Sequence, residues 1–223
     1  MVLKDEYMKE NTSTSNKAEK FWDRSADYYD NEEKKDEFTF LKFIEKAKKY
    51  LKASDIVLDF GCGTGLVCNE IADDAKMIYA IDISSKMIDI AKDKASQGRI
   101  QNINYIYTTI FDDRFKSDSF DAILILNVLH LLDDSQEVIK RLSELLKPEG
   151  HIISATPCMG EKPILNTLFS IGSKIGITPE IKSFKSDELD NLFIKGNFEI
   201  IETDFLKKNS PQYLLIAKKL TSV

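Results

Sequence analysis

The 223-residue chain has few cysteines, few histidines and no long apolar run, and each shortage excludes a class of protein. Its three cysteines form an odd set without a CxxC pair, and only two histidines are present. This pattern predicts neither a disulfide framework nor a zinc site, so we expect reduced thiols and no bound metal. No apolar run approaches the ~20 residues that cross a bilayer, and residues 1–20 lack the apolar core of a secretory signal. We therefore expect a cytoplasmic protein without membrane contact.

The composition is that of an ordinary globular protein, with 43% apolar and 30% charged residues. A formal net charge of −6 disfavours broad attraction to nucleic acid, so a small molecule is the expected partner. The length suits one domain, which we expect to act as a monomer or homodimer.

The chain divides by pattern into a polar leader and one domain. Residues 1–16 carry little apolar surface, which predicts a flexible leader, and residues 17–223 form the domain. Within 17–52 an aromatic-rich stretch that includes Trp22 and Tyr29 precedes a helix of about four turns. The aromatics either pack a short helix on the domain or form a flap that closes over a ligand.

Apolar strand patterns alternate with helical ones through residues 53–155, the cofactor-binding core. This rhythm is typical of βαβ units and predicts an α/β fold with a mostly parallel, Rossmann-like sheet of seven strands and helices on both faces. The expected strands lie at residues 56–60, 77–81, 103–107, 120–126, 151–155, 198–206 and 213–217. The last two form an antiparallel hairpin at the sheet edge, after a helix that ends at Gly196, and together they make up residues 186–223. Residues 156–185 are irregular, with three prolines and an apolar run at 164–171, and are expected to be a substrate lid.

The stretch from Ile56 to Gly65 runs from a buried strand into three glycines spaced by two. Such a turn lets backbone N–H groups approach a ligand, and Asp82 follows at the tip of the next strand, where a carboxylate can bind a ribose. The pair therefore indicates an adenosine-containing cofactor.

Two kinds of adenosine cofactor compete for this turn. A dinucleotide fingerprint requires G-x-G-x-x-G, whereas Gly61, Gly63 and Gly65 give G-x-G-x-G. Asp59 also brings a carboxylate to the turn, which suits an ammonium group better than a pyrophosphate. An NAD(P)-dependent oxidoreductase remains an alternative, as does a protein that binds an adenosyl cofactor without turnover.

Four ordered motifs resemble those of class I S-adenosylmethionine-dependent methyltransferases. They are VLDFGCGTG at 57–65, YAIDIS at 79–84, SFDAIL at 119–124 and LLKPEG at 145–150. The resemblance implies S-adenosyl-L-methionine as cofactor and methyl transfer by in-line displacement to a small-molecule acceptor. It covers about residues 56–155.

The resemblance also implies a set of cofactor contacts. Asp59 would lie near the amino group and Asp82 would bind the ribose, while Tyr29 would lie over the cofactor in the flap. The remaining expected contacts are Trp22 in the flap, the backbone of Gly61, Cys62 and Gly63 at the methionine part, and Ile83 and Met87 at the adenine.

The sequence departs from the family pattern where many members carry an acidic residue for the adenine amine. Thr109 followed by Ile110 occupies that position, so the threonine hydroxyl substitutes for it or Asp112 reaches instead. Asn127, at the end of the fourth expected strand, is a candidate contact to cofactor or substrate. His130 is the candidate catalytic base for an oxygen or carbon acid, and its alternative is a packed or capping residue.

Overall fold

A computed structural model of the chain describes residues 2–174 and 178–221, with side chains from residue 17 onward except that of residue 174. Its centre is one seven-stranded sheet in the order β3-β2-β1-β4-β5-β7-β6. The strands are β1 Ile56–Phe60, β2 Met77–Asp82, β3 Ile103–Tyr107, β4 Phe120–Leu126, β5 Leu146–Pro157, β6 Phe198–Phe205 and β7 Gln212–Lys219.

The first five strands are parallel, and only β7 and β6 run antiparallel to their neighbours. The expected fold class and C-terminal hairpin are therefore confirmed. Chain order reverses at β1, which lies between β2 and β4. The carboxyl ends of the strands at such a switch point are the position where parallel α/β sheets bind ligands.

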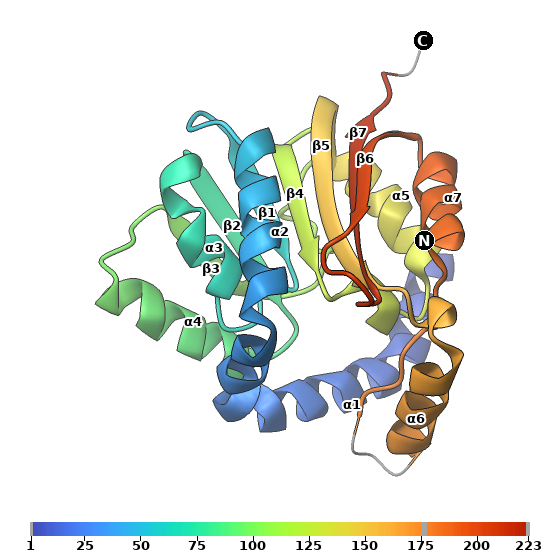
Figure 1. Cartoon of the computed structure of the whole chain (residues 1–223). Helices are drawn as coiled ribbons and strands as arrows, with labels where there is room; N and C mark the ends of the chain where they lie inside the picture. Colours follow the sequence, from blue (N-terminus) through green and yellow to red (C-terminus); the bar gives the residue numbers. More distant parts are fainter. Residues whose placement is uncertain (1, 175–177, 222–223) are drawn as a thin grey trace.

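Helices cover both faces of the sheet (Figure 1). The larger ones are α1 Val2–Glu33, α2 Glu37–Tyr50, α3 Leu66–Glu70, α4 Ser85–Gln97, α5 Ser135–Leu145, α6 Pro163–Lys174 and α7 Ser186–Lys195. The short 3-10 turns are η1 Lys34–Asp36, η2 Ala72–Asp74, η3 Leu129–Leu131 and η4 Met159–Glu161.

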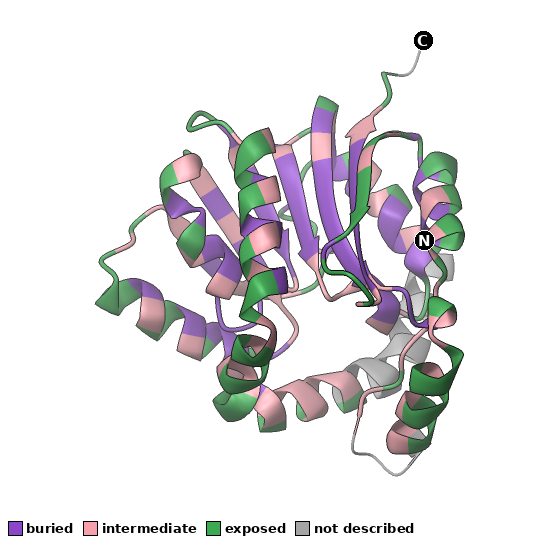
Figure 2. Cartoon of the chain, in the orientation of Figure 1, coloured by how far each residue is buried: buried purple, intermediate pink, exposed green. Residues whose placement is uncertain are grey.

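Alternate residues of each buried strand supply two separate cores. Leu58 and Ile123 face α5 and α7 in one core, whereas Val57 and Leu124 face α2, α3 and α4 in the other. A strand with a helix on each side must be apolar on both faces, which is why the sequence of β4 is almost wholly apolar. Figure 2 shows the strands as the buried centre and α6 as mostly exposed.

Local capping explains where two helices begin. The Ser84 hydroxyl accepts a hydrogen bond from the Met87 N–H at 3.1 Å and starts α4, and Asp134 accepts from the Glu137 N–H at 2.9 Å and starts α5. Helix α5 ends at Leu145, and β5 begins at once, five residues before the expected strand. The register shift beside Phe120 and Ala122 absorbs these extra residues.

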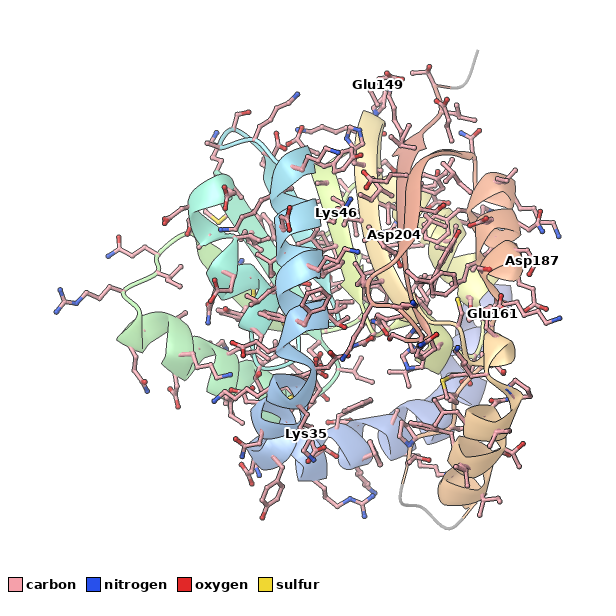
Figure 3. The ribbon with its side chains drawn as sticks, in the orientation of Figure 1. Lys35, Lys46, Glu149, Glu161, Asp187 and Asp204 are labelled. Carbon is pink, nitrogen blue, oxygen red and sulfur yellow. The ribbon has the colours of Figure 1, made fainter. Side chains whose placement is uncertain are left out.

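Ion pairs fix α2 against the hairpin strand β6 (Figure 3). Lys42 Nζ lies 2.9 Å from Asp204 Oδ2, and Lys46 pairs with Glu202, which also accepts a hydrogen bond from Tyr50 Oη at 2.7 Å. This network holds α2 in front of the sheet.

Two segments expected to lack regular structure are helical. Helix α1 already begins at Val2, so the expectation of a flexible leader over residues 1–16 does not describe the backbone from residue 2 onward. The segment has no proline or glycine to interrupt a helix, and its polar composition says little about backbone conformation. Within 156–185, residues 163–174 form α6, whose spacing of Ile164, Leu168 and Ile171 is helical.

Candidate functional site

The glycine turn after β1 is built from backbone that other residues would strain. Gly61, Gly63 and Gly65 have φ values of 75°, 52° and 80°, in the left-handed region. A Cβ on Gly61 would lie 2.3 Å from Cγ2 of Val128. The N–H groups of Gly61 and Cys62 both donate to the carbonyl of Ile81, at 2.9 and 3.0 Å, so the turn is tied to the end of β2.

Asp82 lies at the carboxyl end of β2 and connects the glycine turn to the residues that begin α4. Its Oδ2 accepts from the Gly63 N–H at 2.9 Å and its Oδ1 from the Ser84 N–H at 2.8 Å. Burial raises the pKa of this carboxyl, while these backbone donors oppose the rise. The carboxylate is thereby held in place beside the glycine turn.

Asp59 lies near the end of β1 and lines the small cavity at the glycine turn. Its side chain is 2% exposed, and Oδ2 has no hydrogen-bond partner. Burial raises its pKa to about 7, and the nearby charge of Asp82 adds to the rise while the Cys68 thiol opposes it. A buried carboxylate without a cation costs free energy, so this position favours a positively charged ligand group.

Helix α1 crosses the carboxyl edge of the sheet beneath the strands (Figure 1). Tyr29 lies over the turn, with its Cε1 3.4 Å from where a Cβ on Gly63 would stand. Burial, followed by the charge of Glu33, raises the pKa of the Tyr29 hydroxyl. Trp22 packs edge to face on Tyr29 at 6.3 Å between ring centroids. The structure therefore places these aromatics on a helix that packs on the domain and covers the glycine turn, and closure of this helix over a ligand stays a prediction.

A small cavity of about 20 Å³ remains between α1 and the turn. It is lined by Tyr29, Glu33, Phe40, Asp59, Gly61, Cys62, Leu66, Val67 and Leu126. Burial raises the pKa of the Cys62 thiol, which keeps it protonated. Glu33 was not among the candidate residues, although its position four residues after Tyr29 on one helix would have indicated it.

The expected adenine side follows α4 and the segment after β3. Met87 and Ile110 are buried, Ile83 is half-buried, and Thr109 is exposed, with its hydroxyl accepting weakly from the Phe111 N–H at 3.4 Å.

The alternative adenine contact, Asp112, is already engaged. Its carboxylate accepts from the Thr108 hydroxyl at 2.7 Å and pairs with Arg114. Thr109 is the freer of the two groups, and its contact to the adenine stays a prediction.

Asn127 and His130 follow β4 on the same edge. Asn127 has a φ of 59°, and its Oδ1 accepts from Gln212 Nε2 at 2.6 Å, so the amide is oriented by β7. His130 is 8% exposed, burial lowers its pKa to about 4, and its Nδ1 has no partner. Its ring is neutral at pH 7. The structure does not place His130 against the cavity at the glycine turn, and its catalytic role stays a prediction.

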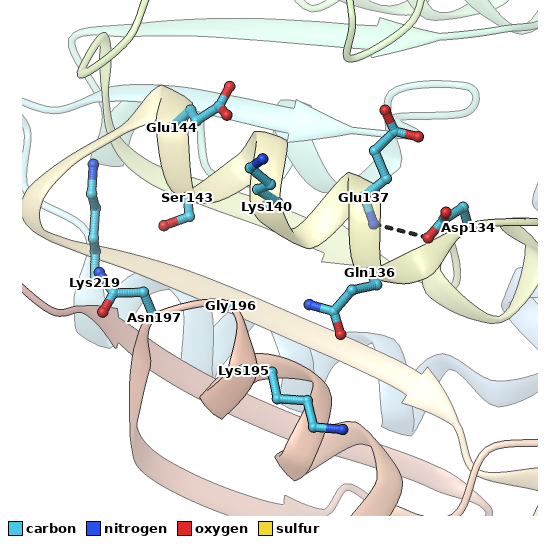
Figure 4. Close-up of a pocket in the computed structure, with 10 residues that line it drawn as sticks. All are labelled: Asp134, Gln136, Glu137, Lys140, Ser143, Glu144, Lys195, Gly196, Asn197 and Lys219. Carbon is cyan, nitrogen blue, oxygen red and sulfur yellow. Dashed lines mark hydrogen bonds between the residues drawn. The ribbon is translucent and has the colours of Figure 1, made fainter. Parts of the chain in front are cut away.

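A larger hollow of about 620 Å³ lies elsewhere, between α5 and the end of α7 (Figure 4). It is lined mainly by solvated polar and charged side chains, including Glu137, Lys140 and Lys195. In Figure 4 the Glu137 N–H donates to Asp134, which is an ordinary helix cap. No buried orphan atom faces this groove among the residues named for it, so the glycine turn is the better candidate site.

Residues 2–174 and 178–221 contain neither a candidate membrane span nor a candidate metal site. No helix of these residues is both long and apolar enough to cross a bilayer. No three histidine, cysteine or acidic side chains among them converge as metal ligands would.

Comparison with known proteins gives matches over the region that holds the site. The family model described as a methyltransferase domain matches residues 51–210. A ubiquinone biosynthesis O-methyltransferase of Coxiella burnetii is 32% identical over 140 residues, which cover 63% of this chain and 58% of the relative. The chain thus spans less than two thirds of that protein's length.

Solved structures share the fold. The protein bound to the methyltransferase activator Trm112 in a Haloferax volcanii complex superposes with a TM-score of 0.73 at 14% identity, covering 90% of this chain and 98% of that one. A SAM-dependent methyltransferase from Methanosarcina mazei gives 0.64 at 22% identity, covering 78% and 96%. At these identities the likeness concerns the fold.

Proposed function

The chain belongs to the methyltransferase-domain family, and on that premise we propose that it transfers a methyl group from S-adenosyl-L-methionine to a small-molecule acceptor. The observation that carries the proposal is Asp59. Its buried Oδ2 lacks a partner beside the glycine turn, and the ammonium group of this cofactor would supply the missing cation.

The residues present fit the rest of the cofactor as well. Asp82 is already oriented by two backbone N–H groups, and its carboxylate can accept hydrogen bonds from the ribose hydroxyls. Ile83 and Met87 would contact the adenine, and Thr109 and Ile110 would border it. Gly61, Cys62 and Gly63 would contact the methionine part through their backbone, beneath Tyr29 and Trp22.

The bound cofactor would supply an activated methyl group on a sulfonium. The chain then has to hold donor and acceptor in line and exclude water, and positioning of this kind can contribute about 7–11 kcal/mol. Helix α1, with Tyr29, excludes water from one side. The neutral ring of His130 could accept a proton from an oxygen acid, although a pKa of about 4 makes it a weak base in the cofactor-free protein.

The acceptor would approach from the side of residues 156–185, where α6 exposes apolar side chains. Ile164 is 81% and Leu168 61% exposed, which favours an apolar acceptor. The named activity of the Coxiella relative, an O-methyltransferase, supports an oxygen acceptor for this chain.

Calorimetry with S-adenosyl-L-methionine tests the proposal. We expect saturable binding, and Asp82→Ala should weaken it by ~1.5–3 kcal/mol because a hydrogen-bonded carboxylate is lost. Asp89→Ala, an exposed carboxylate on α4, is the matched control and should bind normally. No binding at millimolar concentration, or protection from heat by NAD instead, would overturn the assignment. Release of S-adenosylhomocysteine in the presence of phenolic acceptors would separate an enzyme from a protein that only binds the cofactor.

A further inference from the structure

Helix α1 is joined to the core by a row of acidic side chains. Asp23, Asp27 and Asp30 are spaced by four and three residues, so they lie on one face of the helix. That face meets α4 and the glycine turn, the two elements that carry the expected cofactor contacts.

The first two carboxylates bind the beginning of α4. Asp23 Oδ1 accepts from the Ser84 hydroxyl at 2.6 Å and from the Lys86 N–H at 3.3 Å. Asp27 Oδ2 lies 2.5 Å from Lys86 Nζ. The Ser84 N–H also donates to Asp82. These contacts therefore connect α1, through Ser84, to the carboxylate that is expected to bind the ribose.

The third carboxylate binds the glycine turn itself. Asp30 Oδ1 accepts from the buried Thr64 hydroxyl at 2.5 Å, and its Oδ2 pairs with Lys94. The side chains of Lys94 and Asp30 are only 26% and 29% exposed, so solvent screens this pair less than it screens Lys86 and Asp27, at 43% and 56%.

Few side chains in the described part of α1 are fully buried. Of the α1 side chains that the structure describes, residues 17–33, only Ala26 is buried. The described part of the helix is therefore joined to the core by charged and polar contacts beside partly buried aromatic rings, and these contacts can break and re-form without disturbing either apolar core.

In this position α1 blocks the site. The cavity under Tyr29 measures about 20 Å³, whereas pockets that hold small-molecule ligands measure roughly 300–1,000 Å³. The helical path is interrupted after α1 by η1, and Asp36 has φ −125° and ψ 47°, outside the helical region. This break gives α1 a point about which to turn away from the core while α2 stays in place.

We propose that Asp27–Lys86 and Asp30–Lys94 form an ion-pair latch that holds α1 over the cofactor site, and that opening of this latch sets the rates at which the cofactor enters and leaves. The proposal rests on the proposed function. It differs from a purely structural role because the latch must open in every binding event. Weakening it accelerates entry and exit together and alters the affinity less than either rate.

Lys94→Gln tests the latch, with Lys92→Gln as its matched control. Lys92 is exposed on the same helix and makes no ion pair with any described residue, so its variant changes the net charge equally and leaves the latch intact. Stopped-flow fluorescence of Trp22, the only tryptophan and itself on α1, reports binding of S-adenosyl-L-methionine. Hydrogen exchange of the α1 amides reports opening in the cofactor-free protein.

We expect Lys94→Gln to raise the association and dissociation rates and the exchange of α1 amides by about two- to fivefold. Asp30→Asn, which removes the pair from the other side, should do the same. Rates and exchange equal to those of Lys92→Gln would overturn the latch while leaving the proposed function standing. Failure of the unchanged protein to bind S-adenosyl-L-methionine at all would overturn both the proposed function and the latch.

Discussion

Replacement of Asp59 by asparagine should stabilise the cofactor-free protein at pH 8 and weaken cofactor binding. The carboxyl is 2% exposed with an unpartnered Oδ2, and burial raises its pKa to about 7 from 3.8. Between these two values the folded chain retains a proton that the unfolded chain has lost. Ionisation of Asp59 therefore does not lower the free energy of unfolding below about pH 3.8. The free energy of unfolding falls as the pH rises from there and levels off above about pH 7.

The size of this effect follows from the shift. The pKa rises by about three units, and each unit corresponds to 1.36 kcal/mol, so ionisation of Asp59 lowers the free energy of unfolding by ~4 kcal/mol at pH 8. At pH 5, about one unit above the ordinary pKa, the same effect is ~1.5 kcal/mol. Asparagine carries no charge, but its buried N–H lacks an acceptor, which costs about 1–2 kcal/mol. The net gain in the free energy of unfolding is then ~2–3 kcal/mol at pH 8 and near zero at pH 5.

Thermal and urea unfolding at pH 5 and pH 8 measure this difference. For a chain of this size the gain at pH 8 corresponds to about 5–10 °C in Tm. Asp89→Asn, an exposed aspartate on α4, is the control and should show no pH-dependent gain. Calorimetry on Asp59→Asn should show S-adenosyl-L-methionine binding weakened by about 1.5–3 kcal/mol. An effect on stability that is equal at both pH values, or a loss at pH 8, would contradict a buried ionisable carboxyl as its cause.

Two further outcomes follow from the same edge of the sheet. Gly61→Ala should lower the free energy of unfolding by more than about 2 kcal/mol, because the added Cβ would lie 2.3 Å from Val128 Cγ2 at a φ of 75°. In urea unfolding, the double variant with Val128→Ala should recover part of this loss. Additive losses from the two substitutions would contradict a steric cause. His130→Gln should lower kcat for an oxygen acceptor by about 10²–10⁴ while leaving calorimetric cofactor affinity unchanged; an unaltered kcat would identify His130 as a packed residue.

The parts of the fold that depend on apolar patterning could be predicted from the sequence. A strand such as β4, apolar on both faces, has few structural alternatives, and glycines at 61, 63 and 65 with Asp59 and Asp82 already indicate a ligand-facing turn. Polar segments were harder, because a helix without an apolar stripe has no periodic signal. For that reason α1 was expected to begin as a flexible leader, although its backbone is helical from Val2.

The alternation of strands and helices, the glycine turn and the two carboxylates at the strand ends could be predicted from the sequence, because each depends on neighbouring residues. The contacts between residues distant in the chain depend on the tertiary structure. It brings Asp30 onto Thr64 and Lys94, Gln212 onto Asn127, and Val128 against Gly61, and it leaves Asp59 Oδ2 without a partner. Such contacts join residues far apart in the chain, and burial and the pKa of a carboxyl depend on everything that packs around it, which no local pattern records.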